Sequence, residues 1–285
     1  MQKNNKIFSF QGVNGAYSEL AGSIIYPNYH SVACKTFEEM FETVNENKAE
    51  IAIVPIENSR AGRVADTQRL IPESKLKIIG EYFLNVNHCL LGTQNSTINS
   101  IKRVHSHEQA IAQCRNNLIK SNKEMIVAAD TAGAAKLVSE WGNETEGAIA
   151  SELAAKIYNL KIIKSNFQDS DNNVTRFLIM SKNLLNLDKN EKNIMTTLVF
   201  TVRSLPAALY KSLGGFASNG VNITKLESYI HPQGFDVAQF YIDFEGHPED
   251  KSVKLAIEEM KFFCKEIDIL GVYRTSNFRE NNKKS

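Results

Sequence analysis

The sequence changes character within a few residues at Gln168-Asp169-Ser170-Asp171-Asn172-Asn173-Val174-Thr175-Arg176-Phe177-Leu178-Ile179-Met180. Its first half consists of turn-forming Asp, Asn and Ser, and its second half is an apolar run that favours a strand. The stretch therefore predicts a loop that enters a strand, with Thr175 and Arg176 at the junction. A hydroxyl beside a guanidinium there offers a neutral hydrogen-bond donor next to a cationic fork suited to a carboxylate. Alternatively, Thr175 only begins the strand and Arg176 pairs on the surface.

A glycine-containing turn near the N-terminus also joins a strand to a helix. Residues 7–10 alternate as a strand, and Gly12 and Gly15 separate them from a helix predicted to end near Ile25. Glycines at such a turn let backbone N–H groups approach an anion at the start of the helix. Many tight turns also need glycine for their conformation alone, so this signal is weak by itself.

A second apolar strand, residues 50–55, leads into the polar residues Asn58 and Ser59 and then Gly62. Both polar side chains suit a helix cap or a turn. They also suit a ligand, because each can donate a hydrogen bond to a carboxylate or carbonyl oxygen. The residues alone leave both interpretations open.

Two later junctions have the same form. A helix rich in small residues is predicted to begin at Thr131, and a short strand is predicted to end at Ser151. Because open α/β sheets bind ligands at the carboxyl ends of their strands, we expect all these junctions to meet in one pocket. They are the junctions at Gly12, Asn58, Thr131, Ser151 and Thr175.

Two pairs of residues predict capping boxes at helix starts, Thr36 with Glu39 and Ser106 with Gln109. Pro206 is expected in the first turn of a later helix, where proline is favoured.

Composition limits the class of protein. At 285 residues the chain exceeds a typical single domain, so two or three packed units are expected. Its 33 basic residues nearly balance its 32 acidic ones, which argues against nucleic-acid or membrane partners bound through a broad electrostatic field. No apolar run approaches the roughly 20 residues that cross a bilayer, and the N-terminus does not resemble a signal peptide. We therefore expect a cytoplasmic protein.

Cysteine and histidine give no metal-binding pattern. The four cysteines lie far apart in apolar segments and match no zinc spacing, which predicts buried free thiols in a reducing compartment. His88, His105 and His107 are close in sequence, but their spacing puts no pair on one helix face and no carboxylate cluster joins them. We expect no metal and no other cofactor.

The β-type stretch near residues 80–92 is longer than an ordinary strand, so we expect a connector between two lobes, with a return near 160–167. Residues 182–193 are rich in Asn, Asp and Lys and predict a linker. The pattern over residues 194–275 is strand, helix, strand, strand, helix, strand, which predicts a ferredoxin-like unit. The polar tail, residues 276–285, is expected to be disordered.

Several short motifs follow one another along the chain. They are Gly12-x-x-Gly15-x-Tyr17-Ser18-Glu19, Val54-Pro55-Ile56-Glu57-Asn58-Ser59, Gln109-Ala110 with Gln113-Cys114, Thr131-Ala132-x-Ala134-Ala135, Ile149-Ala150-Ser151, Asn173-x-Thr175-Arg176-Phe177 and Asn222-Ile223-Thr224-Lys225-Leu226-Glu227-Ser228. Together they are far more specific than any one of them. The chain resembles monofunctional prephenate dehydratases with a C-terminal ACT regulatory domain, and the resemblance covers Ile7 to about Phe278.

This resemblance implies a catalytic domain over residues 6–181, made of two α/β lobes like those of periplasmic binding proteins with the substrate between them. It also implies the conversion of prephenate to phenylpyruvate, with loss of water and CO2, in L-phenylalanine biosynthesis. No chorismate mutase segment precedes Ile7, so a fused bifunctional enzyme is not expected.

The resemblance implies that Thr175 is the catalytic residue. Aromatisation drives the reaction, so the protein has only to assist departure of the hydroxyl, and Thr175 would donate a hydrogen bond to it. Arg176 would hold the pyruvyl carboxylate, because an arginine on the departing carboxylate would oppose the reaction. Glu57 is a candidate acid, unless it faces solvent. The other substrate-binding candidates are Phe177, Asn58, Ser59, Thr131, Ala132, Ser151, Gly15 and Ser18.

ACT domains of this family usually bind phenylalanine between subunits. Here Ala207 replaces the glycine of the usual Pro-Gly-Ala-Leu motif, and Tyr229 replaces the arginine of Glu-Ser-Arg-Pro. The added methyl group narrows a pocket, and the lost arginine removes a charge. Feedback by phenylalanine is expected, but these departures leave it open. The allosteric candidates are Ala207, Ala208, Leu209, Asn222, Glu227 and Ser228.

Two alternatives remain. Arogenate dehydratase performs the same chemistry on the aminated analogue, and the residues do not separate the two substrates. A non-catalytic regulatory protein that binds a small acid is a different class, against which the retained cleft motifs argue. The expected partners are prephenate, L-phenylalanine and further copies of the chain in a homodimer or homotetramer, without nucleic acid or membrane.

Overall fold

The computed structural model describes residues 6–189, 191–231 and 234–282. The chain divides into two compact units, each with its own fold. The first unit contains the residues up to 67 together with 82–177, and the second contains 68–81 together with the residues from 178 onward. The second unit thus takes in a short segment from the first third of the chain, which the expected boundary at residue 181 does not include.

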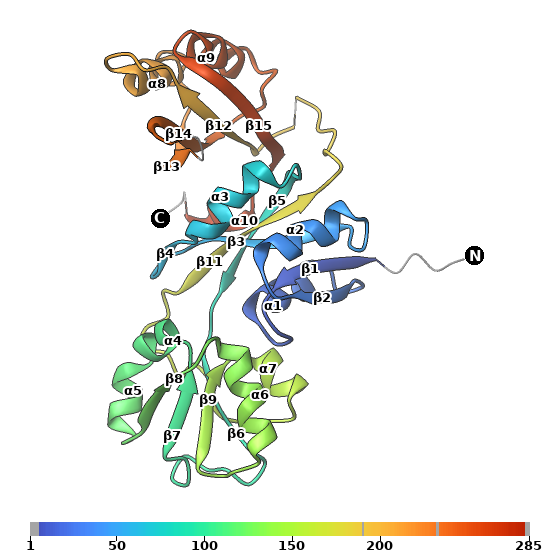
Figure 1. Ribbon diagram of the computed structural model, residues 1–285, viewed down its shortest axis with the longest axis vertical. Helices are drawn as coiled ribbons and strands as arrows, with labels where there is room; N and C mark the ends of the chain where they lie inside the picture. Colours follow the sequence, from blue (N-terminus) through green and yellow to red (C-terminus); the bar gives the residue numbers. More distant parts are fainter. Residues whose placement is uncertain (1–5, 190, 232–233, 283–285) are drawn as a thin grey trace, which may run out of the picture. The chain divides into compact units, whose positions relative to one another are not determined.

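The first lobe of the first unit is built on a sheet that begins with parallel strands (Figure 1). Its strands, in spatial order, are β2 (His30–Cys34), β1 (Ile7–Gln11), β3 (Ile51–Asn58), β11 (Val174–Ser181) and β5 (Lys77–Asn85), of which β11 and β5 continue into the second unit. Its helices are α1 (Tyr17–Ile25), α2 (Phe37–Asn45) and the start of α3 (Ala65–Glu73). β1 pairs in parallel with both β2 and β3. The run from Ile51 to Val54 is buried throughout, as is typical of a parallel strand covered on both faces.

A short hairpin follows β3 that the sequence did not predict. Strand β4 (Gly62–Arg63) pairs antiparallel with the end of β3, so that Glu57 lies opposite Arg63 and Asn58 lies opposite Gly62. Gly62 has a φ of 80°, a left-handed conformation that glycine adopts easily. The hairpin turns the chain back over the carboxyl end of β3.

The second lobe contains a five-stranded mixed sheet (Figure 1). Its strands, in spatial order, are β10 (Lys161–Lys164), β6 (Cys89–Gly92), β9 (Glu146–Ala150), β7 (Arg103–Ser106) and β8 (Glu124–Val127). Its helices are α4 (Glu108–Gln113), α5 (Arg115–Lys120), α6 (Thr131–Trp141) and α7 (Glu152–Ile157). Leu90 and Ile149 pack in the cluster that contains α4 and α5, whereas Cys89 and Ala148 pack with α6 and α7. Successive side chains therefore serve opposite faces, and helices cover both.

The helix caps match the predictions only in part. Thr36 Oγ1 accepts a hydrogen bond from the Glu39 N–H at 3.1 Å, which confirms that cap. Ser106 does not cap α4, because its hydroxyl donates to the carbonyl oxygen of Ile149 at 2.6 Å inside the sheet. His107 is the residue that caps α4.

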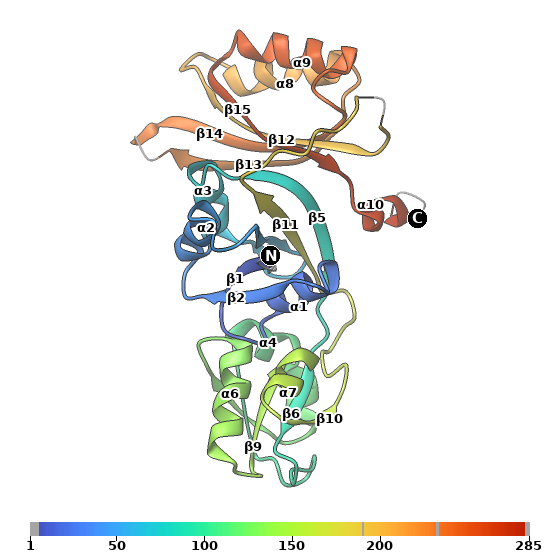
Figure 2. The same cartoon turned by 90° about the vertical axis from the view of Figure 1, so that its right-hand side faces the viewer.

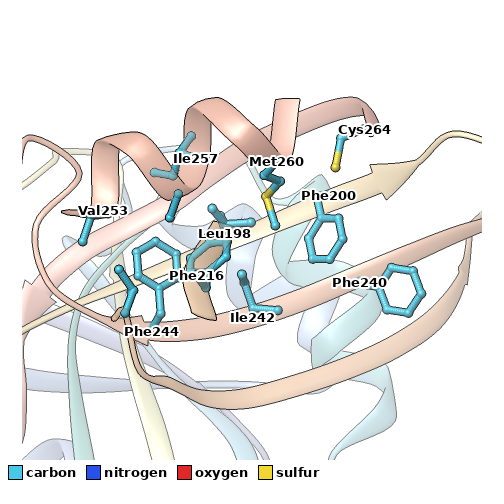
Figure 3. Close-up of a cluster of buried hydrophobic side chains, with 12 residues drawn as sticks. Leu198, Phe200, Phe216, Phe240, Ile242, Phe244, Val253, Ile257, Met260 and Cys264 are labelled. Atoms are coloured by element: carbon cyan, nitrogen blue, oxygen red, sulfur yellow. The ribbon is translucent and has the colours of Figure 1, made fainter. Parts of the chain in front are cut away.

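The second unit has the predicted βαββαβ order (Figure 2). Its elements are β12 (Ile194–Val202), α8 (Ala208–Ser218), β13 (Ile223–His231), β14 (Gly234–Glu245), α9 (Lys251–Lys261), β15 (Cys264–Arg274) and α10 (Asn277–Asn282). The strands lie in the order β13-β14-β12-β15 and pair antiparallel. Buried Leu198, Phe200, Ile242 and Phe244 of the strands pack against residues of α8 and α9 (Figure 3). This is the expected ferredoxin-like arrangement.

The end of the chain differs from the expected disordered tail. Residues 277–282 form α10, while 283–285 lie outside the described residues. Arg279 donates to both carboxylate oxygens of Glu81, at 2.7 and 3.0 Å, and the Ser276 N–H donates to the same group at 3.1 Å. The Glu81 side chain is fully buried, and a buried carboxylate needs such partners. The tail is therefore ordered by a charge that hydropathy does not reveal.

A buried carboxylate also lies in the second lobe. Glu146 accepts a hydrogen bond from Arg103 Nε at 2.9 Å and from His105 Nε2 at 2.7 Å. Its side chain is only 4% exposed. Burial raises the pKa of this carboxyl, but the hydrogen bonds and charges of Arg103 and His105 outweigh burial, so the pKa is lowered.

A lowered pKa gives a definite pH dependence of stability. Glu146 stabilises the fold fully above the carboxyl pKa of the unfolded chain, about 4.3, and this contribution is lost as pH falls through the lower pKa of the folded state. We expect Glu146→Gln to be less stable than the wild type at pH 7 and to lose less stability on acidification. Urea unfolding of both proteins between pH 7 and pH 3 measures the two slopes. If the free energy of unfolding falls equally steeply with pH in both proteins, the pKa of Glu146 is not lowered by folding.

Candidate active site

A cleft of about 570 Å³ lies in the first unit, lined by residues of both lobes. Its volume suits a small-molecule site. The first lobe contributes Tyr17, Ser18, Asn58, Arg63, Thr175 and Phe177, and the second lobe contributes His107, Gln109, Gln113, Asp130 and Thr131, while Val86 and His88 line it from the segment that joins the lobes. The expectation that polar junctions from distant parts of the chain meet in one pocket is confirmed for Asn58, Thr131 and Thr175.

Five of the predicted site residues line this cleft and five do not. Those that line it are Ser18, Asn58, Thr131, Thr175 and Phe177. Gly15, Ser59, Ala132, Ser151 and Arg176 are not among the lining residues. Ser151 caps α7 and donates to the carbonyl oxygen of Gly15 at 2.6 Å, which joins the two lobes. Ser59 Oγ accepts from the Val174 N–H at 2.9 Å.

The orientation of Thr175 is set by Asn58. The Oδ1 atom of Asn58 accepts hydrogen bonds from the N–H groups of Arg60 and Ala61, at 2.9 and 2.8 Å. The amide nitrogen of Asn58 therefore faces the other way, and it donates to Thr175 Oγ1 at 2.8 Å. Because Thr175 Oγ1 accepts this bond, its own hydrogen is left to be donated into the cleft.

Arg176 lies on the opposite face of β11 from Thr175 and Phe177, because side chains alternate along a strand. Its side chain is 1% exposed, and it forms an ion pair with Glu57 at 3.1 Å and lies over the Phe83 ring. The expectation that Arg176 holds the substrate carboxylate does not agree with this geometry. Glu57, the candidate acid, is engaged by Arg176 and does not line the cleft either.

His88, for which the sequence predicted no functional role, lies at the centre of a polar network. His88 Nε2 contacts Gln113 Oε1 at 2.8 Å, and its Nδ1 contacts the Tyr17 hydroxyl at 2.7 Å. Burial lowers the pKa of the His88 imidazole and raises the pKa of Tyr17. Tyr17, Gln113 and Asn173 belong to the sequence motifs, but their spacing does not show that they meet. The described residues contain no group of three potential metal ligands.

The cleft presents a helix N-terminus and a guanidinium to an anion. The N-terminus of α1 reaches it through Tyr17 and Ser18, and Ala16 supplies no side-chain cap. The N-terminus of α6 reaches it through Thr131 but is already capped by the Asp130 carboxylate, which accepts from the Gly133 N–H at 2.6 Å. Arg63 of the β4 hairpin also lines it. The uncapped N–H groups and the dipole of α1, together with this guanidinium, favour a carboxylate ligand.

The second unit has a cavity of about 470 Å³ of its own, lined by residues 202–209 with Ala238 and Phe240. Three of the allosteric candidates, Ala207, Ala208 and Leu209, line it, whereas Asn222, Glu227 and Ser228 do not. Ala207 has a φ of 60° and directly precedes α8. Pro206 therefore lies before the cap and not in the first helical turn, where it was expected.

Fold and site together are typical of a two-lobed α/β enzyme with a small-molecule site between its lobes. The family model for prephenate dehydratase matches residues 8–184. The chain belongs to the prephenate dehydratase family.

Relatives share nearly the whole length of the chain. A bifunctional N-acyl-homoserine lactone acylase/prephenate dehydratase of Komagataeibacter europaeus is 44% identical over 96% of this chain and 98% of its own. Arogenate dehydratase 2 of Petunia hybrida is 37% identical over 93% of this chain and 71% of its own. The crystal structure of prephenate dehydratase in complex with L-Phe from Arthrobacter aurescens is 28% identical, with a TM-score of 0.84, over 94% of this chain and 90% of that one. Within the described part of the chain, no helix is long and apolar enough to cross a membrane.

Burial of Arg176 against Glu57 predicts that Arg176 affects stability more than substrate binding. Arg176→Met should lower the free energy of unfolding by about 1–3 kcal/mol, because it removes the charged hydrogen-bond partner of Glu57, whose side chain is 33% exposed, and the contact with Phe83. Arg69→Met removes the exposed ion pair with Glu73 and should cost less than about 1 kcal/mol. Urea unfolding measures both. If Arg176→Met is as stable as the wild type and its KM is strongly raised, Arg176 binds the substrate and this prediction is wrong.

Proposed function

We propose that this enzyme converts prephenate to phenylpyruvate with Thr175 as the hydrogen-bond donor to the departing hydroxyl. The observation that carries the proposal is the 2.8 Å hydrogen bond from Asn58 to Thr175 Oγ1 at the cleft. Because Thr175 Oγ1 accepts that bond, its hydroxyl hydrogen is available to a ligand. The C–O bond and the bond to the ring carboxylate break, giving CO2, an aromatic ring and a hydroxide that takes one proton from solvent to become water.

The dehydration requires little from the protein beyond a hydrogen-bond donor to the departing hydroxyl. A threonine hydroxyl is too weak an acid to release a proton at neutral pH, so it acts by stabilising negative charge on the departing oxygen. A hydroxyl that already accepts a hydrogen bond is the better donor, because hydrogen bonds in a chain polarise one another. Asn58 therefore strengthens Thr175 as well as orienting it.

The two substrate carboxylates need different treatment. The ring carboxylate loses its charge as CO2 leaves, so tight binding of that charge would oppose the reaction. The pyruvyl carboxylate keeps its charge throughout. We assign it to Arg63 and the start of α1, in place of the buried Arg176.

Incubation of the purified protein with prephenate, followed in the ultraviolet for phenylpyruvate, tests the proposed function. Arogenate is the second substrate to assay, because plant relatives are arogenate dehydratases and the two acids differ only at one keto or ammonium group. An N-acyl-homoserine lactone is the third, given the name of the Komagataeibacter europaeus relative. Absence of product from prephenate and arogenate alike would refute a dehydratase and favour a protein that only binds small acids.

Replacing Thr175 separates a catalytic from a binding role. Thr175→Ala should lower kcat by about 10²- to 10³-fold with KM little changed, because the lost donor acts mainly in the transition state. Thr175→Ser is the matched control, since it keeps the hydroxyl and should keep most of the activity. Near-normal turnover by Thr175→Ala would remove this residue from the mechanism.

We further propose that the βαββαβ unit is an ACT domain that senses L-phenylalanine, and that the enzyme works in the cytoplasm as a homodimer or homotetramer. The cavity beside Ala207 in this unit supports a ligand site, and the Arthrobacter aurescens relative was solved with L-Phe. We also propose that the catalytic domain ends near residue 181, the linker near 193 and the ACT domain near 275. Inhibition assays with and without millimolar phenylalanine test the regulation.

Ala207 gives a sharper test of that cavity. Its left-handed backbone disfavours a Cβ, so Ala207→Gly should raise the free energy of unfolding by about 0.5–1 kcal/mol. Removing the methyl group should also widen the cavity and increase the stabilisation that L-phenylalanine gives. Ala217→Gly, at an exposed position of α8 outside the cavity, is the control and should destabilise the protein by up to about 1 kcal/mol. Thermal unfolding with and without phenylalanine measures both effects, and equal losses in the two variants would contradict the role given to the backbone.

A further inference from the structure

His88 is held rigidly in the segment that joins the two lobes. Its backbone N–H donates to Gln168 Oε1 at 2.9 Å, and its carbonyl oxygen accepts from the Phe167 N–H at 2.7 Å. The residue is 3% exposed, yet it lines the cleft. Both segments that connect the lobes therefore hold the backbone of His88 in place.

The amides between His88 and Thr175 have defined orientations. Asn58 is fixed by two backbone N–H groups, and its nitrogen also donates to Asn173 Oδ1 at 2.8 Å. The nitrogen of Asn173 then donates to Gln113 Oε1 at 2.6 Å. Since Gln113 presents its oxygen to Asn173, the same oxygen faces His88 Nε2 at 2.8 Å. This arrangement requires a hydrogen on His88 Nε2, donated to Gln113. In the neutral ring it also requires the Tyr17 hydroxyl, which lies 2.7 Å from Nδ1 and 3.0 Å from the Asn87 carbonyl oxygen, to donate its one hydrogen to Nδ1.

We propose that His88 is a positioning residue for the dehydration: its Nε2–H fixes Gln113 and Asn173, which hold Asn58 so that Thr175 directs its hydroxyl hydrogen at the substrate. This inference rests on the proposed function. The hydrogen-bond chain also joins the two lobes, because Gln113 belongs to the second lobe and Asn173 and Asn58 belong to the first. The amide chain that reaches Thr175 through Asn58 is complete only when both lobes contribute.

The chain orients groups and does not deliver a proton. Three amide side chains separate His88 from Thr175, and a carboxamide does not exchange protons as a hydroxyl or imidazole does. The Nε2–H is present in the neutral Nε2–H tautomer and in the charged imidazole, so protonation at Nδ1, beside Tyr17, leaves the chain intact. The other titratable groups near this pair are Cys89, Cys114 and Glu152, and those facing the cleft are Arg63, Asp66, His107 and Asp130.

Two substitutions separate the donor from the rest of the ring. In His88→Gln the side-chain nitrogen can reach the position of Nε2 and still donate to Gln113, whereas the amide of His88→Asn reaches only the position of Nδ1. We expect His88→Asn to lower kcat up to about 10²-fold with KM little changed, as for a misplaced catalytic group, and His88→Gln to recover most of the loss. His105→Gln, in a part of the second lobe away from the network, controls for replacing a partly buried histidine.

Two further measurements complete the test. The first does not depend on turnover, and the second distinguishes positioning from acid catalysis. Nitrogen NMR of the wild type should show the hydrogen on His88 Nε2, and the opposite tautomer would overturn the proposal even if the enzyme is active. The pH profile of kcat in His88→Gln should match the wild type between pH 5.5 and 8.5, whereas loss of one limb would make His88 an acid and overturn positioning.

The activity results separate the two proposals. If the wild type turns over prephenate or arogenate but both His88 variants do so equally well, the positioning role fails and the proposed function stands. If the wild type turns over neither substrate, the proposed function fails, and the positioning role fails with it.

Discussion

The structure of the cleft depends on one amide group, that of Asn58. Its oxygen is satisfied by two backbone N–H groups of the turn after β3, and its nitrogen reaches both Thr175 and Asn173. A rotated amide would present an oxygen to the Thr175 hydroxyl and draw its hydrogen away from the substrate. The turn and the short β4 hairpin are thus part of the catalytic geometry, although they touch no reacting atom themselves.

The two lobes are coupled through polar contacts and through a small-residue contact. The carbonyl oxygen of Gly15 receives the hydroxyl of Ser151, and a Cβ added to Gly15 would overlap the backbone of Ala154. A further contact runs through Gln113 and Asn173. A side chain at Gly15 would therefore push the lobes apart at Ala154. It would also weaken the contact between Gln113 and Asn173, on which the proposed orientation of Asn58 depends.

Local pattern was sufficient for most of the fold and for part of the site. Period-two apolar runs and helix starts predicted the lobes and the βαββαβ unit, and turn residues at strand ends predicted the positions of Asn58, Thr131 and Thr175. Alternation along the strand would by itself place Thr175 and Arg176 on opposite faces, so one substrate cannot easily contact both. Ser106 had a helix-capping spacing, but its hydroxyl is used inside the sheet. The role of His88 required knowledge of which distant amides approach it, and single-sequence spacing does not contain that information.

The fully buried carboxylate of Glu81 has a practical consequence for the end of the chain. Residues 276–282 look dispensable by hydropathy, because they are polar and charged. Shortening the protein before Arg279 would remove the guanidinium that neutralises an interior charge and would leave the strand that bears it poorly solvated. Shortened or tagged versions of the protein should therefore keep residues 276–282 intact, because this internal ion pair depends on them.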